Sequence, residues 1–95
     1  TNSFPSGEKF GLVSQMRRCS VSVTSNIAEG FGRKTAKDKK SYFTQSKGSV
    51  AELQSQVLLA RDLNYISESD FEKIVKQTKE VDKLIAGLCK SAQNR

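Results

Sequence analysis

The sequence predicts an all-α protein, an up-down antiparallel bundle of helices in a single domain that spans residues 1–95. Three long segments repeat apolar residues with the 3.6-residue period of a helix, at about 8–29, 35–63 and 67–91. The connections between these segments are short, and short connections make consecutive helices antiparallel neighbours. Ninety-five residues bury only a modest core. We therefore expect such a bundle to gain cover from further helices or other copies of the chain.

The first segment keeps one apolar stripe over more than five helical turns. The stripe consists of Leu12, Met16, Cys19, Val23, Ile27 and Gly30. Three more apolar residues, Phe10, Val21 and Ala28, lie away from this stripe and widen the apolar arc to about half the circumference, where a surface helix needs only about 100°. The alternation in Val21-Ser22-Val23 is too short to favour a strand. The sequence thus predicts a helix with two separate partners, preceded by a turn at residues 4–7.

The first helix is predicted to end at about Glu29, and the chain is expected to reverse near Gly30 to Lys34. Glycine permits backbone angles that are closed to other residues, and two glycines stand here. We expect Glu29 to bond backbone amides of the turn or to pair with Arg18 or Arg33. The predicted structural residues of the turn are Asn26, Glu29, Gly30 and Gly32.

The starts of the two later helices carry capping-box patterns, Thr35 with Asp38 and Ser67 with Asp70. The apolar face of the middle helix is formed by Tyr42, Phe43, Ser46, Ser49, Val50, Leu53, Val57 and Ala60. In the last helix, Phe71, Ile74, Thr78, Val81, Ile85 and Leu88 make a heptad-like stripe. Residues after Ser91 are expected to fray. Gly48 inside the middle helix indicates either a close helix neighbour or simple tolerance.

The net charge is +6, from 16 basic and 10 acidic side chains, and residues 33–47 alone contribute +5. A local positive excess favours a polyanionic partner such as RNA or DNA. A second basic line recurs every seven residues on the middle helix. The candidate nucleic-acid-binding residues are Arg33, Lys34, Lys37, Lys40, Lys47 and Arg61. The alternative interpretation is a solvated basic face that only keeps the protein soluble. Tyr42 and Phe43 are phased toward the core and are expected to pack there.

The sequence contains few residues that carry chemistry. It has no histidine, so histidine bases, histidine triads and histidine metal sites are excluded. The two cysteines, Cys19 and Cys89, lie far apart on predicted helices and are expected to be free thiols. Glu29 is the one carboxylate to consider for catalysis, and a structural role is favoured for it. We expect no enzyme activity, no cofactor, no metal ion, no membrane span and a cytoplasmic location.

Several motifs resemble those of the 23S rRNA intervening-sequence protein family. They are Phe10-Gly11-Leu12, Gln15, Arg17-Arg18, the stretch from Ser25 to Arg33, Ser49 to Gln54, Ala60 to Leu63 and the final helix. The resemblance implies a small bacterial four-helix bundle, of which this chain would hold three helices, in a homopentameric ring. It also implies kinship with the accessory variability determinant of diversity-generating retroelements. That protein is thought to bring nucleic acid to a reverse transcriptase through a basic surface.

Two functional hypotheses follow. In the first, the chain forms a homo-oligomer that binds the phosphate backbone of RNA or DNA through its basic surface. In the second, it is a protein-interaction scaffold whose apolar faces contact other subunits or a partner enzyme, and the lysines only keep the surface soluble.

Overall fold

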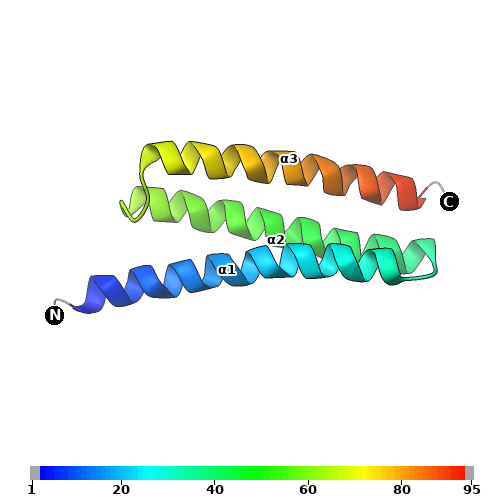
Figure 1. Ribbon diagram of the computed structural model, residues 1–95, viewed down its shortest axis with the longest axis horizontal. Coiled ribbons are helices and arrows are strands. Elements are labelled where there is room, and N and C mark those ends of the chain that lie inside the picture. Colours follow the sequence, from blue (N-terminus) through cyan, green and yellow to red (C-terminus); the bar gives the residue numbers. More distant parts are fainter. Residues whose placement is uncertain (1–2, 94–95) are drawn as a thin grey trace.

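The computed structural model describes the backbone of residues 3–93 and the side chains of residues 7–93. Over this range the protein is all-α, with three helices: α1 (Ser3–Gly32), α2 (Ala36–Asp62) and α3 (Glu68–Gln93). Figure 1 shows them side by side in an elongated rod, whose principal extents are 55 × 23 × 13 Å. The predicted fold class is confirmed, and the described residues hold no strand at residues 21–23, in agreement with the rejection of one from the sequence.

The middle helix organises the packing. α1 and α3 each pack along α2, antiparallel to it, and barely touch each other. The α1–α2 turn lies at one end of the rod, beside the carboxyl end of α3, and the α2–α3 loop lies at the other end, beside the start of α1 (Figure 1). Three helices in this arrangement leave an open groove between α1 and α3.

The helix bounds differ from the predicted ones by more than one residue at three ends. α1 ends at Gly32, three residues past the predicted end at 29, so residues 30–32 are helical and the chain reversal is confined to residues 33–35. α1 begins at Ser3, so the turn expected at residues 4–7 is wrong and this segment is helical. Pro5 is tolerated because the first turn of a helix leaves its backbone N–H groups unbonded in any case. α3 continues to Gln93, past the point where fraying was expected. A final turn that still buries Ala92, at 3 % exposure, explains the extension.

Both predicted N-caps are confirmed. The Thr35 hydroxyl accepts a hydrogen bond from the Asp38 amide at 3.1 Å, and the Ser67 hydroxyl accepts one from the Asp70 amide at 3.0 Å. Each cap satisfies an amide that has no partner within its helix, which stabilises a helix by roughly 1 kcal/mol.

The core runs along the line where all three helices meet. Val23 from α1, Phe43 and Val50 from α2, and Ile85 and Ala92 from α3 form its buried cluster. All five lie on the predicted stripes or directly continue them, since Ala92 follows Ile85 by one heptad. Both cysteines are free thiols, as expected. Within the described residues, none of the three helices has a stretch long and apolar enough to cross a membrane.

Candidate nucleic-acid interface

A glycine near the end of α1 is needed for the packing of α1 on α2, but not for the special backbone angles that the sequence suggested. Neither Gly30 nor Gly32 has a positive φ, so the expectation that they supply special backbone angles is wrong. Instead, the ring of Phe43 packs directly on Gly30, where an added Cβ would overlap ring atom Cε1 and lie 2.8 Å from Cδ1. The absence of a side chain at Gly30 therefore lets α2 approach α1. Phe31 then meets the same ring edge-on, with 5.5 Å between the ring centroids.

A lysine from α2 completes the end of α1. The Lys39 ammonium donates to the carbonyl oxygens of Phe31 at 3.1 Å and Gly30 at 3.4 Å. The last carbonyls of a helix have no partner within it, and the carboxyl end of the helix dipole favours a cation. Lys39 belongs to the segment in which lysines are densest, but its own role is structural.

Arg33 is also engaged in the turn. Its guanidinium donates to the Glu29 carboxylate at 3.0 Å and to the Tyr42 hydroxyl at 2.7 Å, and it lies 4.7 Å from the centre of the Tyr42 ring. Tyr42 and Glu29 together raise the pKa of Arg33. The expected pairing of Glu29 with Arg33 is confirmed. Because the pair is exposed, it contributes little to stability, but it fixes the guanidinium against Tyr42.

A chain of polar contacts joins α1 to α2 below the turn. The Ser22 and Ser49 hydroxyls are 2.9 Å apart, and the Asn26 amide donates to the carbonyl and hydroxyl oxygens of Ser22. One turn further, the Cys19 thiol donates to the Glu52 carboxylate at 3.4 Å. Burial and this carboxylate raise the pKa of the Cys19 thiol. These residues hold the two helices in register and leave Cys19 protonated, which is the unreactive form of a thiol.

Four of the six predicted binding residues remain available for a ligand. Lys34, Lys37 and Lys47 are exposed and Lys40 is half-buried. The ion pairs of the described side chains, Glu29 with Arg33 and Arg61 with Asp62, leave these four lysines without a carboxylate partner there.

Arg61 is separated from the other predicted residues. It lies near the opposite end of α2, stacks 4.3 Å from the centre of the Phe71 ring and donates to Asp62. Its role in the structure is to join α2 to α3.

The charge of the rod is divided unevenly along its length. The Ser22–Ser49 contact marks the middle of α2, and antiparallel packing brings Lys83 of α3 to about the same level. We call residues 22–49 and 83–93 the turn end, and residues 3–21 and 50–82 the loop end. The turn end holds eight basic and two acidic residues, whereas the loop end holds seven basic and eight acidic ones. The positive charge of the protein is therefore a property of one end.

Two lysines of α3 belong to this end, and the sequence analysis missed them. Contacts of Gln54 with Thr78 and of Arg61 with Phe71 set the level at which α2 and α3 pair. That pairing carries Lys47 and Lys40 to within about two residues of Lys83 and Lys90. Each of these α3 lysines is exposed. A sequence signal existed. Lys83 and Lys90 each follow a residue of the α3 stripe, Val81 and Leu88, by two positions, so the two lysines lie on one line along α3. The charge of the segment did not reveal this line, because α3 as a whole is neutral.

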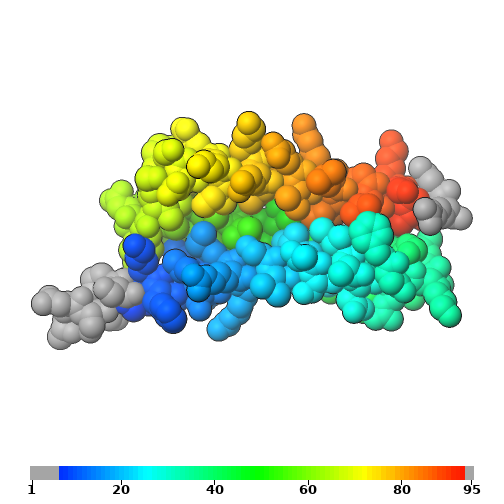
Figure 2. Space-filling view, in the orientation of Figure 1, coloured from blue at the N-terminus to red at the C-terminus, as the bar shows by residue number. Residues whose placement is uncertain are grey.

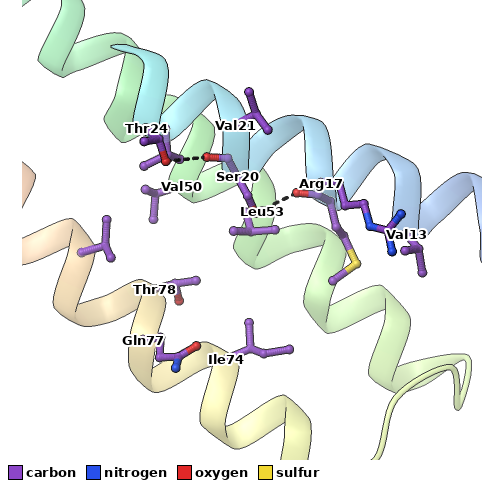
Figure 3. Close-up of a pocket in the computed structure, with 13 residues that line it drawn as sticks. Val13, Arg17, Ser20, Val21, Thr24, Val50, Leu53, Ile74, Gln77 and Thr78 are labelled. Carbon is purple, nitrogen blue, oxygen red and sulfur yellow. Dashed lines mark hydrogen bonds between the residues drawn. The ribbon is translucent and has the colours of Figure 1, made fainter. Parts of the chain in front are cut away.

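The groove between α1 and α3 has a different character. It has a volume of about 710 Å³, and α2 forms its floor. Figure 2 shows α2 in green between the other two helices, and Figure 3 shows the lining residues. Most of the lining is apolar, and Arg17 on the α1 rim is the charged residue among the described lining residues: Val13, Met16, Arg17, Ser20, Val21, Val23, Thr24, Val50, Leu53, Ile74, Gln77, Thr78 and Val81. The groove therefore suits an apolar helix face and does not suit a phosphate.

Within residues 3–93, no group of three or more histidine, cysteine, aspartate or glutamate side chains is placed to hold a metal ion. No curated protein matches the chain. A family model described as 23S rRNA-intervening sequence protein matches residues 1–87, which is most of the sequence. Together with the three antiparallel helices, this match confirms the resemblance seen in the motifs. The chain belongs to the 23S rRNA-intervening sequence protein family.

Proposed function

We propose that this protein is a non-catalytic, self-associating helical protein that binds the phosphate backbone of RNA or DNA through its turn end. The observation that carries the proposal is the concentration of eight basic and two acidic residues at that end. A rod with one positive end attracts a polyanion to that end and orients it there, because the summed field of the charges is directional.

The type of residue favours binding without sequence selection. Lysine presents a mobile point charge, which suits phosphate oxygens and lacks the forked geometry with which arginine reads guanine. Arg33, the predicted site residue with that geometry in the turn, is already held by Glu29 and Tyr42. We therefore expect Lys34, Lys37, Lys40 and Lys47 to meet phosphates, with Lys83 and Lys90 extending the surface across α3.

Self-association is part of the proposal because single phosphate contacts are weak. Repeating a turn end in several copies raises the apparent affinity by avidity without any new contact. Phe10 and Val21, which are 73 % and 64 % exposed, supply apolar surface for such an assembly. The family resemblance implies a homopentamer, and the related accessory variability determinant implies a reverse transcriptase as a partner; we take both as expectations.

A non-catalytic role is supported by the contacts of the side chains that could take part in catalysis, because these side chains already have partners in the structure. The sequence has no histidine. Glu29 pairs with Arg33, and Glu52 accepts from a thiol whose pKa is raised. A thiol in that state is a poor nucleophile.

The test combines assembly with polyanion binding. Light scattering gives the mass of the purified protein, and the retention of lysate RNA shows whether a polyanion is carried along. Titration with two unrelated RNA sequences and a duplex DNA then gives affinity against salt. We expect similar affinities for unrelated sequences and a log–log salt slope of roughly 0.7–0.9 for each phosphate contact.

A variant in which Lys34, Lys37, Lys40 and Lys47 are all changed to Gln should lose most of this slope while keeping its helicity. Arg61→Gln is the control, since Arg61 stacks on Phe71 at the loop end and should leave the slope unchanged. Equal binding by the fourfold variant and the original protein would refute the proposal.

A second candidate, a protein-interaction scaffold, is favoured by the groove alone. The groove occupies the place of the fourth helix in a four-helix bundle, so its ligand would be an amphipathic helix. If the fourfold lysine variant keeps its partners and its assembly while the original protein binds no nucleic acid, the scaffold becomes the leading function.

A further inference from the structure

One line of exposed side chains runs along α1 on the side turned away from α2, and two of its members, Arg17 and Val21, also line the edge of the groove between α1 and α3. Phe10, Arg17, Val21 and Ala28 follow one another at steps of seven, four and seven residues, and all four are exposed. Such steps keep residues within about 40° of arc on a helix and span about 27 Å. The line lies opposite Cys19, whose thiol contacts Glu52 of α2, and in Figure 3 the Val21 side chain points away from α3, at the edge of the groove that it lines. We call these four residues the α1 ridge.

A matching line runs along the outer surface of α2. Ser41, Gly48, Glu52 and Leu59 are also spaced by seven, four and seven residues, and all four are exposed. They lie roughly 80–140° around α2 from Lys40 and Lys47, and away from the contacts of Gln54 and Arg61 with α3. A Cβ built on Gly48 would meet nothing within 4 Å, so the chain itself does not fill the space above this glycine. We call this set the α2 outer line.

We propose that the α1 ridge of one copy packs antiparallel on the α2 outer line of a second copy. In this register Phe10 meets Leu59, Arg17 meets Glu52, Val21 meets Gly48 and Ala28 meets Ser41. The inference rests on the proposed self-association and deepens it, because it names the two surfaces that join the copies.

The residue pairs are complementary in size and in charge. Phe10 and Leu59 are large exposed apolar side chains, 73 % and 49 % exposed, which an aqueous surface does not favour. Val21 enters the free space over Gly48, as a knob enters a hole between packed helices.

The charged pair sets the register. Arg17 lies in the middle of an otherwise uncharged ridge, and its counterpart Glu52 carries the one charge of the outer line. Only one oxygen of the Glu52 carboxylate accepts from Cys19, so the other is available to the arginine. A shifted register would leave Arg17 and Glu52 without an opposite charge, so the pair favours this register.

The geometry of the assembly follows from the use of two different surfaces. Each copy has one ridge and one outer line, so the contact is heterologous and continues from copy to copy into a ring or a filament. Since α1 and α2 are antiparallel within one chain, an antiparallel contact between copies keeps neighbouring rods pointing the same way. All turn ends then lie on one side of the assembly, which concentrates the lysines on a single face.

A charge exchange tests the contact. Arg17→Glu places two carboxylates together and Glu52→Arg places two guanidinium groups together, so each single variant should weaken association by at least about tenfold. The double variant R17E/E52R restores an opposite pair in every contact and should recover the assembly. Sedimentation velocity over a wide concentration range measures the masses, and circular dichroism checks that helicity is retained.

Two further variants make the test specific. Arg18→Glu changes the charge equally beside the ridge, and it should leave the assembly intact. Gly48→Phe fills the space that Val21 needs without meeting any atom of its own chain within reach of the new Cβ, and it should dissociate the copies.

The outcomes separate this inference from the proposed function. Single variants that assemble like the original protein, or a double variant that stays dissociated, would overturn the ridge contact. If the single variants assemble like the original protein, self-association stands without the ridge contact. Nucleic-acid binding is measured on the same samples and does not depend on either outcome. An original chain that sediments as a 10.5 kDa monomer at all concentrations would remove the contact and the proposed self-association together.

Discussion

At the turn end, side chains reach across the connection to end α1, whereas at the loop end backbone hydrogen bonds end α2. Lys39 bonds the last carbonyls of α1, and Phe43 packs on Gly30. In the loop, Asn64 adopts a left-handed conformation with φ of 60°, and the amides of Asn64 and Tyr65 bond the carbonyls of Arg61 and Ala60. This is the Schellman pattern that ends many helices.

The two ends also differ in charge, mainly through their acidic residues: the turn end holds two and the loop end eight, beside eight and seven basic residues. Some of the positive charge at the turn end has a structural purpose, because Lys39 and Arg33 are held in the connection. At the loop end, Arg61 is likewise held by Phe71 and Asp62. The proposed function depends on the lysines that remain after the structural ones are subtracted.

The largest effect on stability is expected from Gly30→Ala at the turn end. The new Cβ overlaps the buried Phe43 ring, and overpacking of this kind outweighs the roughly 1 kcal/mol that alanine gains in a helix. We expect a net loss of about 1–2 kcal/mol, measured by thermal unfolding at one fixed protein concentration. Gly87→Ala is the matched control on α3, where a Cβ meets nothing within 4 Å, and it should stabilise the protein. Equal effects of the two changes would contradict the close approach of Phe43.

A smaller effect on stability is expected from alanine substitutions in the two connections between helices. Asn64→Ala puts a Cβ-bearing residue without a local polar group into a left-handed conformation, which costs about 1 kcal/mol. Gly32→Ala at the other connection should be neutral or stabilising, because Gly32 has no positive φ and an added Cβ meets nothing within 4 Å. Urea unfolding of both variants measures the difference. Destabilisation by Gly32→Ala alone would show that the turn, and not the loop, needs the special backbone angle.

The smallest effect concerns pH, and it arises at the level where α1 and α2 are joined by Cys19 and Glu52. Burial and Glu52 raise the pKa of Cys19 in the folded protein. In the unfolded chain the thiol ionises near its ordinary pKa of about 8.5, so stability is constant below that pH and falls as the pH rises above it. Comparing unfolding at pH 7 and above pH 9 in the original protein and in Cys19→Ala isolates this fall. A fall of the same size in both proteins would assign it to other groups.

The helices and their partners were predictable because periodicity and caps are local signals. The stripe from Leu12 to Gly30 and the caps at Thr35 and Ser67 are all present in the structure. The role of the turn glycines was not predictable. A glycine between helices suggests a left-handed turn, while the ring that packs on Gly30 comes from Phe43 on another helix, and no local pattern reveals that contact.

The candidate site was predictable only in part, for a similar reason. Lys34, Lys37, Lys40 and Lys47 are close in sequence, so they appear as a basic window. Arg61 shares their seven-residue repeat but lies at the loop end, because a repeat follows a face of the helix along its whole length. Lys83 and Lys90 join the turn end only through the antiparallel return of α3, which the charge of a sequence window does not show.

The most direct test of the central claim compares two variants that lose the same charge at opposite ends of the rod. Lys37, Lys40 and Lys47 are changed to Gln in the first, and Lys9, Lys73 and Lys76 in the second. The salt dependence of binding to one single-stranded RNA is measured for both. We predict that the turn-end variant loses roughly two units of log–log slope, at about 0.7 for each contact removed, while the loop-end variant keeps the original slope. Equal slopes for the two variants would show that binding follows net charge alone, and would contradict a nucleic-acid interface at the turn end.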